Sequence, residues 1–203
     1  MNFLAHFHLA WPDELLVLGG LQGDFHKGPL PGNLNPDLQA GVALHRAIDA
    51  YTDSHVEIAT LRRMFPAELR RYAGILIDLC FDHILARQWD NYSTVPLDQF
   101  INETYSLLAQ HSGLLSEGAA LMASRIREYD LLTRYQHWET ITASAAHIGQ
   151  RLRRENPLHK AGDLLLPLLP ELERSFAVFY PQLVEFSRHN VMLAPPPAEN
   201  QHD

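Results

Sequence analysis

Apolar residues recur at intervals of three and four along nearly the whole chain of 203 residues, and no segment shows the strict alternation of a half-buried strand. This spacing places apolar side chains on one face of an α-helix, so the sequence predicts an all-α protein. A chain of this length buries about 70% of its unfolded surface as one domain. We therefore expect a single compact multi-helix domain over residues 1–192. The proline-rich, polar residues 193–203 are expected to form a disordered tail.

Proline and glycine mark the ends of the expected helices. Pro12 ends a short first helix, and residues 27–36 form a loop with three prolines and two glycines. Asn35 followed by Pro36 is typical of a helix start, and Pro66 separates two helices. The helices expected after the first cover about residues 13–25, 35–52, 54–64, 66–91, 96–111, 116–128, 137–154 and 171–190.

Composition excludes several classes of protein. The single cysteine, Cys80, allows neither a disulfide framework nor a cysteine-rich zinc site, and it suits a reducing compartment. No apolar run approaches the roughly 18 residues that span a bilayer, and the N-terminus lacks the basic region of a signal peptide. A formal net charge of −8 disfavours non-specific binding to nucleic acid. We expect a cytoplasmic protein that binds neither membrane nor nucleic acid.

Histidine is unusually frequent, with 12 residues. It is the commonest metal ligand and the natural acid–base group near neutral pH. Most of these histidines are expected at the surface. Two segments nevertheless hold candidate metal ligands. Asp24 stands at the end of the second expected helix, and His45, Asp49 and Asp53 follow one another at intervals of four residues. Residues at that interval share one face of a helix.

A third segment places polar residues inside a strongly apolar stretch. Asp78, Asp82 and His83 stand between the runs AGILI and ILA. A helix this apolar is mostly buried, so Asp78 and His83 are expected to face the interior, where an unpartnered carboxylate is costly. A cation shared by the three segments would satisfy them together. Mixed histidine and carboxylate ligands suit Mn, Fe or Zn, and carboxylate-rich sets also suit Mg.

A purely structural explanation of these residues stays open. An aspartate on an apolar helix can cap a neighbouring helix or pair with an arginine, and Arg46 could pair with Asp49 or Asp53 at the surface. On this interpretation the chain is a non-catalytic helical binding module. Three such clusters within the first 83 residues nevertheless favour a metal centre.

The N-terminal segment holds two further histidines. His6 and His8 are two residues apart and cannot share a helix face. Both lie among apolar residues, so a buried histidine bonded to a backbone carbonyl is the simpler explanation for each, with His6 as a candidate for a functional role. Asn2 is expected to cap the first helix.

The opening MNFLAHFHLA closely resembles the start of the acyl carrier protein phosphodiesterase family, whose members are also called acyl carrier protein hydrolases. Later segments agree with that family in order and spacing, from Met1 to about Arg188. The agreement is specific over the first 90 residues and weak over residues 95–170. The matching segments are Gly20 to Asp24-Phe25, His45-Arg46-x-x-Asp49 with Thr52-Asp53, Asp78-x-x-x-Asp82-His83, Trp89, and Phe179-Tyr180-Pro181.

The resemblance implies a fold and a reaction. The implied fold is helical and distantly related to the HD-domain metal-dependent phosphohydrolases. The implied reaction is hydrolysis of the phosphodiester that joins 4′-phosphopantetheine to a serine of holo acyl carrier protein, which gives the apo carrier protein and free phosphopantetheine. The implied cofactor is a divalent cation, typically Mn²⁺, with Mg²⁺ or another divalent cation as a substitute.

The resemblance also implies site residues. Metal-binding positions are expected at Asp24, His45, Asp78, Asp82 and His83, of which Asp24, Asp82 and His83 are also the expected catalytic residues. The adjacent Asp82-His83 pair resembles the HD signature, but the surrounding order differs from ordinary HD enzymes, so the direct ligands stay open. Residues expected to support these positions or to contact substrate are His6, Arg46, Asp49 and Asp53.

The implied partner requires a local basic surface. Acyl carrier proteins are acidic and this chain carries a formal net charge of −8, so attraction between the whole molecules is unfavourable. A cluster of arginines flanks the Phe65-Pro66 break and is the expected docking surface; a second group lies at residues 151–154. The docking cluster comprises Arg62, Arg63, Arg70 and Arg71.

Another enzymatic function uses the same residues. A metal-dependent HD-like phosphohydrolase of a small nucleotide or phosphoester would need the metal cluster but no basic docking surface. The two functions therefore differ in whether the docking arginines matter.

Overall fold

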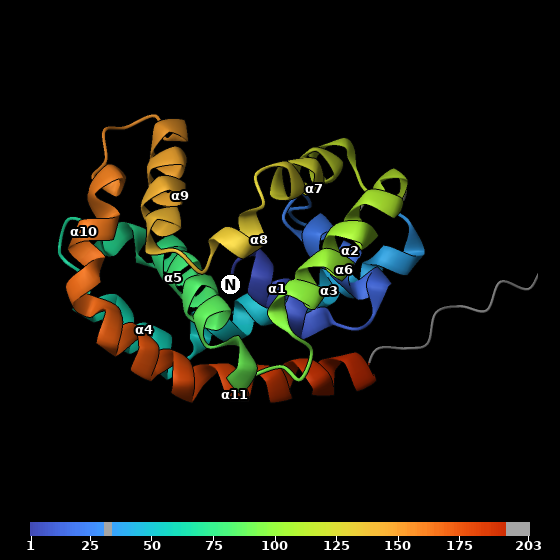
Figure 1. Ribbon diagram of the computed structural model, residues 1–203, viewed down its shortest axis with the longest axis horizontal. Helices are drawn as coiled ribbons and strands as arrows, with labels where there is room; N and C mark the ends of the chain where they lie inside the picture. The colour runs from blue at the N-terminus through green and yellow to red at the C-terminus, as the bar shows by residue number, and fades with distance from the viewer. Residues whose placement is uncertain (31–33, 194–203) are drawn as a thin grey trace, which may run out of the picture.

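The computed structural model describes residues 1–30 and 34–193, and within these ranges the chain is all-helical, as the sequence predicts (Figure 1). The tail expected at 193–203 falls almost wholly outside the described residues, so that boundary stays a prediction. The α-helices are α1 (Phe3–Ala10), α2 (Glu14–Gly23), α3 (Pro36–Ser54), α4 (Val56–Met64), α5 (Ala73–Arg87), α6 (Leu97–Gln110), α7 (Glu117–Glu128), α8 (Leu131–Arg134), α9 (Trp138–Arg151), α10 (Ala161–Leu165) and α11 (Leu169–Leu193). Short 3₁₀ helices are η1 (Arg70–Tyr72), η2 (Trp89–Asn91), η3 (Ser112–Leu114), η4 (Leu158–Lys160) and η5 (Leu166–Leu168).

Helix starts follow local chemistry. The Asp13 carboxylate accepts hydrogen bonds from the backbone N–H groups of Leu15 and Leu16 at the start of α2, which satisfies donors that have no partner within the helix. Ser116 caps α7 in the same way through the N–H of Ala119. Both starts agree with the sequence-based boundaries.

Two expectations about helices were wrong. The long helix expected over 66–91 is divided, because turns and η1 occupy the residues before α5 begins at Ala73 and η2 follows after it ends. The short helices α8 and α10 were not predicted, since four or five residues are too few to show an apolar period. The final helix contains Pro181 in its interior.

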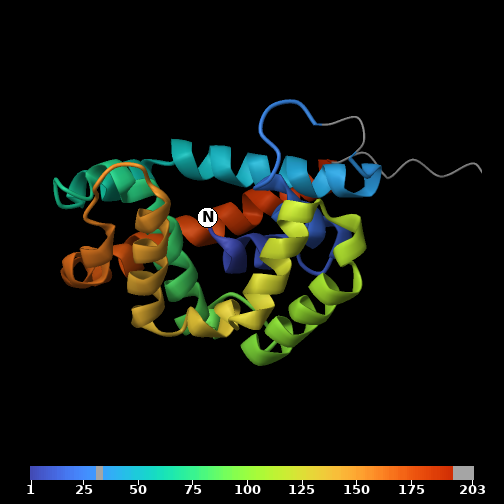
Figure 2. The same ribbon diagram turned by 90° about the horizontal axis from the view of Figure 1, so that it is seen from above.

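Helix α1 lies in the middle of the molecule, where it contacts α2, α3, α5 and α11. The first residue of the chain is near the centre of both the front view and the view from above (Figure 1, Figure 2). Helix α11 runs along the lower side in Figure 1 and contacts α3, α4 and α5. The residues that begin the chain are therefore surrounded by elements from its whole length.

Helices α2 and α3 approach each other closely through two glycines. A Cβ atom added at Gly19 would lie 2.7 Å from the Cα of Gly41, a distance that real Cβ atoms do not tolerate. The absence of side chains at this crossing lets the two backbones touch. The close packing brings the C-terminal end of α2 against the middle of α3, where the site described below begins. No described helix is long and apolar enough to cross a membrane.

Candidate metal centre

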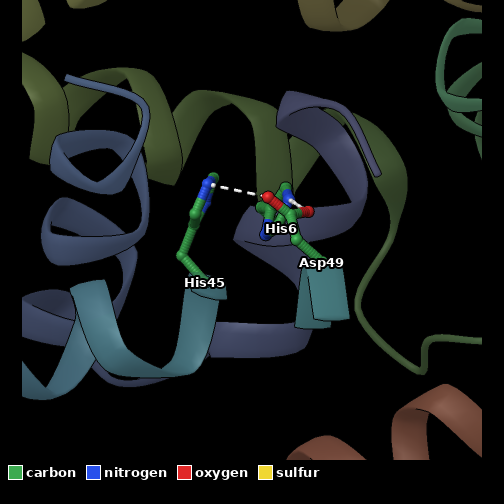
Figure 3. Close-up of side chains that lie close together, drawn as sticks. All are labelled: His6, His45 and Asp49. Carbon is green, nitrogen blue, oxygen red and sulfur yellow. Dashed lines mark ion pairs between the residues drawn. The ribbon is translucent and has the colours of Figure 1, made fainter. Parts of the chain in front are cut away.

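Three side chains from two helices converge on one point: His6 from α1 and His45 and Asp49 from α3 (Figure 3). The Asp49 carboxylate bridges the Nε2 atoms of the two rings, with Oδ1 3.2 Å from His6 Nε2 and Oδ2 3.2 Å from His45 Nε2. One potential ligand atom from each residue lies within 4.8 Å of the others. Both histidines are buried, whereas the Asp49 side chain is 45% exposed. The cluster is therefore open to solvent on its carboxylate side.

Asp24 adds a second carboxylate from the end of α2. Its Oδ1 atom lies 3.6 Å from His45 Nε2, and its side chain is 46% exposed. The preceding residue has to be glycine for this approach, because a Cβ atom at Gly23 would lie 2.7 Å from Cγ and Cδ2 of the His45 ring. The end of α2 thus packs directly on the imidazole that Asp24 faces.

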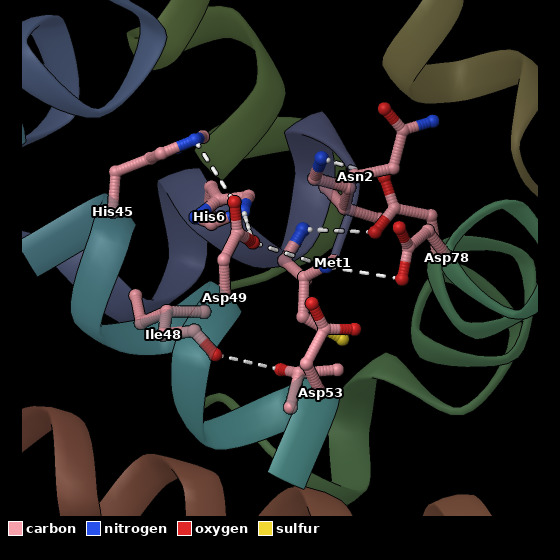
Figure 4. A network of polar contacts seen from close by, with 12 residues as sticks. Met1, Asn2, His6, His45, Ile48, Asp49, Asp53 and Asp78 are labelled. Atoms are coloured by element: carbon pink, nitrogen blue, oxygen red, sulfur yellow. Dashed lines mark hydrogen bonds and ion pairs between the residues drawn. The ribbon is translucent and has the colours of Figure 1, made fainter. Parts of the chain in front are cut away.

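Asp78 of α5 is joined to the same network (Figure 4). The amino group of Met1 lies 3.1 Å from Asp78 Oδ1 and 3.5 Å from Asp49 Oδ1. The Asp78 side chain is 33% exposed. The amino group of Met1 is therefore the cation that links Asp49 of α3 to Asp78 of α5, while Asp24 at the end of α2 contacts the network through His45.

Burial sets the protonation of these groups. It lowers the pKa of His6 to about 4, so the ring is neutral near pH 7 and one ring nitrogen carries a free lone pair. Burial alone would raise the pKa of Asp49, but the contacts with His45 and His6 outweigh it and hold that pKa well below its usual range. Burial raises the pKa of Asp24 and, against the pull of the Met1 amino group, that of Asp78.

The donor atoms of this cluster fit a divalent cation. Both ring nitrogens of His6 and Nδ1 of His45 are buried without a hydrogen-bond partner. His6 Nε2 is close enough to Asp49 for an ion pair, yet the contact lacks hydrogen-bond geometry. Buried polar atoms without partners cost about 1–3 kcal/mol each. A cation bound at the Nε2 atoms and carboxylate oxygens that face one another would satisfy His6 Nε2, and this ligand set suits Mn, Fe or Zn.

Asp82, a predicted ligand and catalytic residue, has other contacts. It is fully buried, and its carboxylate accepts hydrogen bonds from the backbone N–H groups of Leu4 at 2.8 Å and Ala5 at 3.2 Å. Burial raises its pKa to about 7, although these two donors act in the opposite direction. The structure therefore places Asp82 against the first turn of α1.

His83, the neighbouring predicted ligand, lies in different surroundings. Its Nδ1 donates to the backbone carbonyl of Tyr135 at 2.7 Å, and its ring meets the edge of Trp138 with centroids 5.3 Å apart. Asp78 and His83 are five residues apart on α5 and so point about 140° apart around the helix. His83 faces α8 and α9, whereas Asp78 contacts the amino group of Met1. Its Nε2 is buried without a partner. The structure does not bring His83 together with His6, His45 and Asp49.

Of the three residues of α3 expected to support the site, Asp49 lies in the cluster, and the other two have other partners. Arg46 donates to the backbone carbonyl of His26 at 2.9 Å, which ties α3 to the segment after α2. Asp53 forms an ion pair with Arg62 at 2.6 Å, and the Asp53 side chain is largely exposed, whereas that of Arg62 is partly buried. Neither residue contacts the imidazole pair.

The predicted docking arginines lie on α4 and η1. Arg62 is engaged by Asp53, as described above. Arg63, Arg70 and Arg71 are exposed, with Arg70 donating to the backbone carbonyl of Phe65 at 3.4 Å and Arg71 lying 5.0 Å from the centre of the Tyr72 ring. Their role in docking stays a prediction.

Two residues have contacts that the sequence did not indicate. Asn2 occupies the cap position of α1, but its side chain makes no capping bond and donates instead to the hydroxyl of Tyr135 at 2.7 Å. The expectation of a side-chain cap was wrong, because Asp82 already takes the free N–H groups there. Tyr135 lies in the region where the family resemblance is weak, so no motif pointed to it.

The fold and the site define an all-helical protein with a half-open cluster of imidazoles and carboxylates suited to a divalent cation. Comparison with known sequences identifies the family. Residues 1–183 match the family described as "Acyl carrier protein phosphodiesterase", and the chain belongs to it. The resemblance inferred from the sequence is thereby confirmed.

Curated relatives extend over most of the chain. The acyl carrier protein phosphodiesterase of Photorhabdus laumondii is 31% identical over 193 residues, covering 91% of this chain and 94% of the relative. The acyl carrier protein phosphodiesterase of Serratia proteamaculans is 32% identical over 186 residues, covering 91% of this chain and 96% of the relative. The acyl carrier protein phosphodiesterase of Escherichia coli strain K12 / DH10B is 42% identical over 102 residues, covering 50% of this chain and 53% of the relative. No solved structure matches the chain.

Proposed function

We propose that this protein hydrolyses the phosphodiester between 4′-phosphopantetheine and the serine of holo acyl carrier protein, at a divalent-cation centre held by His6, His45 and Asp49. Membership of the acyl carrier protein phosphodiesterase family supports the substrate. The observation that supports the cation most directly is the convergence of two buried imidazoles on one carboxylate, where His6 Nε2 has no hydrogen-bond partner. This mixed ligand set suits Mn, Fe or Zn, among which the family resemblance favours Mn²⁺; Mg²⁺ is a weaker candidate because imidazole ligands do not favour it.

The cation would lower the pKa of a coordinated water and offset charge on the phosphoryl oxygens. The chain's own residues have separate tasks. Neutral His6 offers a lone pair, the His45 ring faces the same carboxylate, and ionised Asp49 supplies the negative charge that both rings contact. The half-exposed Asp24 carboxylate lies beside His45 and is open to solvent, so we assign it as the base that takes a proton from the attacking water and returns it to the serine oxygen as the phosphorus–oxygen bond breaks. Asp78 orients the cluster from α5.

Docking of the acidic carrier protein is assigned to the basic surface on α4 and η1. Because the chain has a formal net charge of −8, a carrier protein of the same sign is attracted only by a local group of cations. Arg63, Arg70 and Arg71 are exposed there. Arg62 belongs to the same surface but is shared with Asp53.

The test is direct. Purified protein is incubated with holo acyl carrier protein and Mn²⁺, and the mass of the carrier protein is followed. The proposal predicts loss of the phosphopantetheine mass, and the loss should stop when the cation is chelated. An unchanged carrier mass with Mn²⁺, Mg²⁺ and Zn²⁺ across neutral pH would refute the proposed reaction. Hydrolysis of small phosphodiesters alone would instead favour a small-molecule phosphohydrolase.

A further inference from the structure

The first turn of α1 is fixed to α5 by a buried carboxylate. The N–H groups at a helix start have no partner within the helix, and negative charge is favourable there. Asp82 takes two of them, the N–H groups of Leu4 and Ala5, while its side chain is fully removed from solvent. These two bonds fix the backbone of this turn to α5, in addition to the ion pair between the Met1 amino group and Asp78.

A second contact holds the same end of α1. The Asn2 side-chain amide donates to the hydroxyl of Tyr135 at 2.7 Å, and Tyr135 is fully buried. The backbone carbonyl of Tyr135 accepts from Nδ1 of His83 at 2.7 Å. A carbonyl can only accept, which assigns the proton to Nδ1. Asp82 and His83 therefore support one helix end, Asp82 directly and His83 through Tyr135.

His6 comes immediately after this fixed turn. Its own backbone N–H donates to the carbonyl of Asn2 at 3.1 Å. His6 is also the one residue of α1 in the cluster with His45 and Asp49. A displacement of the turn would move the imidazole of His6 relative to Asp49, whose carboxylate belongs to another helix.

We propose that Asp82 is a positioning residue that acts on the cation centre through His6 and does not bind the cation, with Tyr135 as a second support. The inference rests on the proposed function only in requiring that His6, His45 and Asp49 hold a cation. Both Asp82 oxygens are already engaged by backbone donors. Residues that orient metal ligands typically change metal affinity by about 10–100-fold when substituted.

The experiment is a double-mutant cycle on the full chain, with Mn²⁺ affinity measured by calorimetry. Asp82→Asn keeps the size of the side chain but presents a donor to one of the two N–H groups. We expect it to weaken Mn²⁺ binding by about tenfold or more. In a His6→Ala background the same substitution should cause no further loss, because the residue through which Asp82 acts is gone.

Two results would overturn the inference. An equal additional loss in the His6→Ala background would mean that Asp82 binds the cation itself, and unchanged affinity in folded Asp82→Asn would mean that it has no role. If Asp82→Asn does not fold, Tyr135→Phe replaces it in the double-mutant cycle. We expect Tyr135→Phe to weaken Mn²⁺ binding several-fold in the wild-type background and to cause no further loss in the His6→Ala background. Unchanged affinity of Tyr135→Phe would then count against the inference.

A control tests the general effect of removing a hydrogen-bonded phenol hydroxyl. Tyr105→Phe in α6 also deletes a bonded hydroxyl, which donates to Asp130 at 3.0 Å and accepts from the N–H of Leu132. It should leave Mn²⁺ affinity unchanged. If the wild-type protein binds no divalent cation and leaves holo acyl carrier protein intact, the proposed function fails together with this inference. If the wild-type protein binds the cation and hydrolyses holo acyl carrier protein, but the two substitutions lower Mn²⁺ affinity additively, only this inference is overturned.

Discussion

The imidazole of His6 lies nearly parallel to that of His45, with ring centroids 4.2 Å apart and an angle of 22° between the planes, although the two rings come from different helices. Two stacked neutral rings can present nitrogens to a shared cation, whereas two imidazolium rings at this distance would repel each other. The Asp49 carboxylate contacts both. This arrangement makes Asp49 the residue on which the cation centre most depends.

Asp49→Asn should abolish Mn²⁺ binding and hydrolysis together. The substitution keeps the shape of the side chain but removes the negative charge between His6 and His45. We expect a loss of Mn²⁺ affinity greater than the about 100-fold that outer partners of metal ligands cause. Calorimetry with Mn²⁺ and the carrier-protein mass assay measure both effects. Asp98→Asn at an exposed position of α6 is the matched control and should change neither. Retained affinity in Asp49→Asn would exclude it as a ligand.

Gly23→Ala should lower activity because the new Cβ would lie 2.7 Å from the His45 ring, which must then turn or move. The matched control is on the same helix: a Cβ at Gly20 meets nothing within 4 Å. Gly20→Ala should keep full activity and raise stability by roughly 0.5–1 kcal/mol, as glycine is unfavourable inside a helix. Assay of both variants against holo acyl carrier protein, with thermal unfolding, separates the two effects. Similar activity in the two variants would show that the His45 position is tolerant.

The helical content was accessible from the sequence because it depends on local signals. The period of apolar residues, the cap at Ser116 and the break at Pro66 each act over a few residues. The short helix α8 lacked such a signal, since its position depends on packing. In the site, too, local features could be predicted from the sequence and features that depend on packing could not. The four-residue interval from His45 to Asp49 places both on one face of α3, which the sequence indicated.

The relative orientation of helices was not accessible. His6 belongs to a different helix from His45, and no spacing rule relates them, so the sequence favoured a buried structural histidine over a place at the centre of the cluster. Asp82 and His83 are adjacent in the sequence but face α1 and Tyr135 respectively. The motif selected Asp82 and His83 as candidate site residues but did not predict which residues each one contacts. The roles predicted for Asp82 and His83 as ligands thus stay predictions that the experiments above decide.

Acid should destabilise the protein through His8. Burial lowers the pKa of His8 to about 4 in the folded state, where Nδ1 lies 2.8 Å from the Tyr180 hydroxyl. The unfolded chain, with a pKa near 6.5, binds more protons between pH 6.5 and about 4. Stability therefore falls as pH falls through this window, by up to about 1.4 kcal/mol per pH unit from this group. Above pH 6.5 the group contributes no slope.

Urea unfolding at a series of pH values measures this slope. His8→Gln should show a shallower decline of unfolding free energy between pH 6.5 and 4 than wild type, since it has no proton to bind there. The exposed His147 of α9 is the control, and His147→Gln should leave the slope as in wild type. Equal slopes for wild type and His8→Gln would contradict the assignment.

Removal of the docking arginines should separate partner binding from chemistry. Substituting Arg62, Arg63, Arg70 and Arg71 by alanine leaves the cluster of His6 and its partners intact, because none of the four contacts it. We expect about tenfold or greater loss of kcat/KM on holo acyl carrier protein at low salt, with the loss shrinking as salt screens the wild-type attraction. Turnover of a small phosphodiester should survive.

The basic group at the end of α9 and beyond provides the control for this variant. Alanine at Arg151, Arg153 and Arg154 removes nearly as much positive charge from another exposed part of the chain, so a general charge effect would reduce activity on the carrier protein in both variants. Loss only in the first variant, and only on the protein substrate, locates docking on α4 and η1. Equal loss on the carrier protein and on the small phosphodiester would mean that these arginines support the fold or the chemistry, and the acidic partner would then have to dock elsewhere.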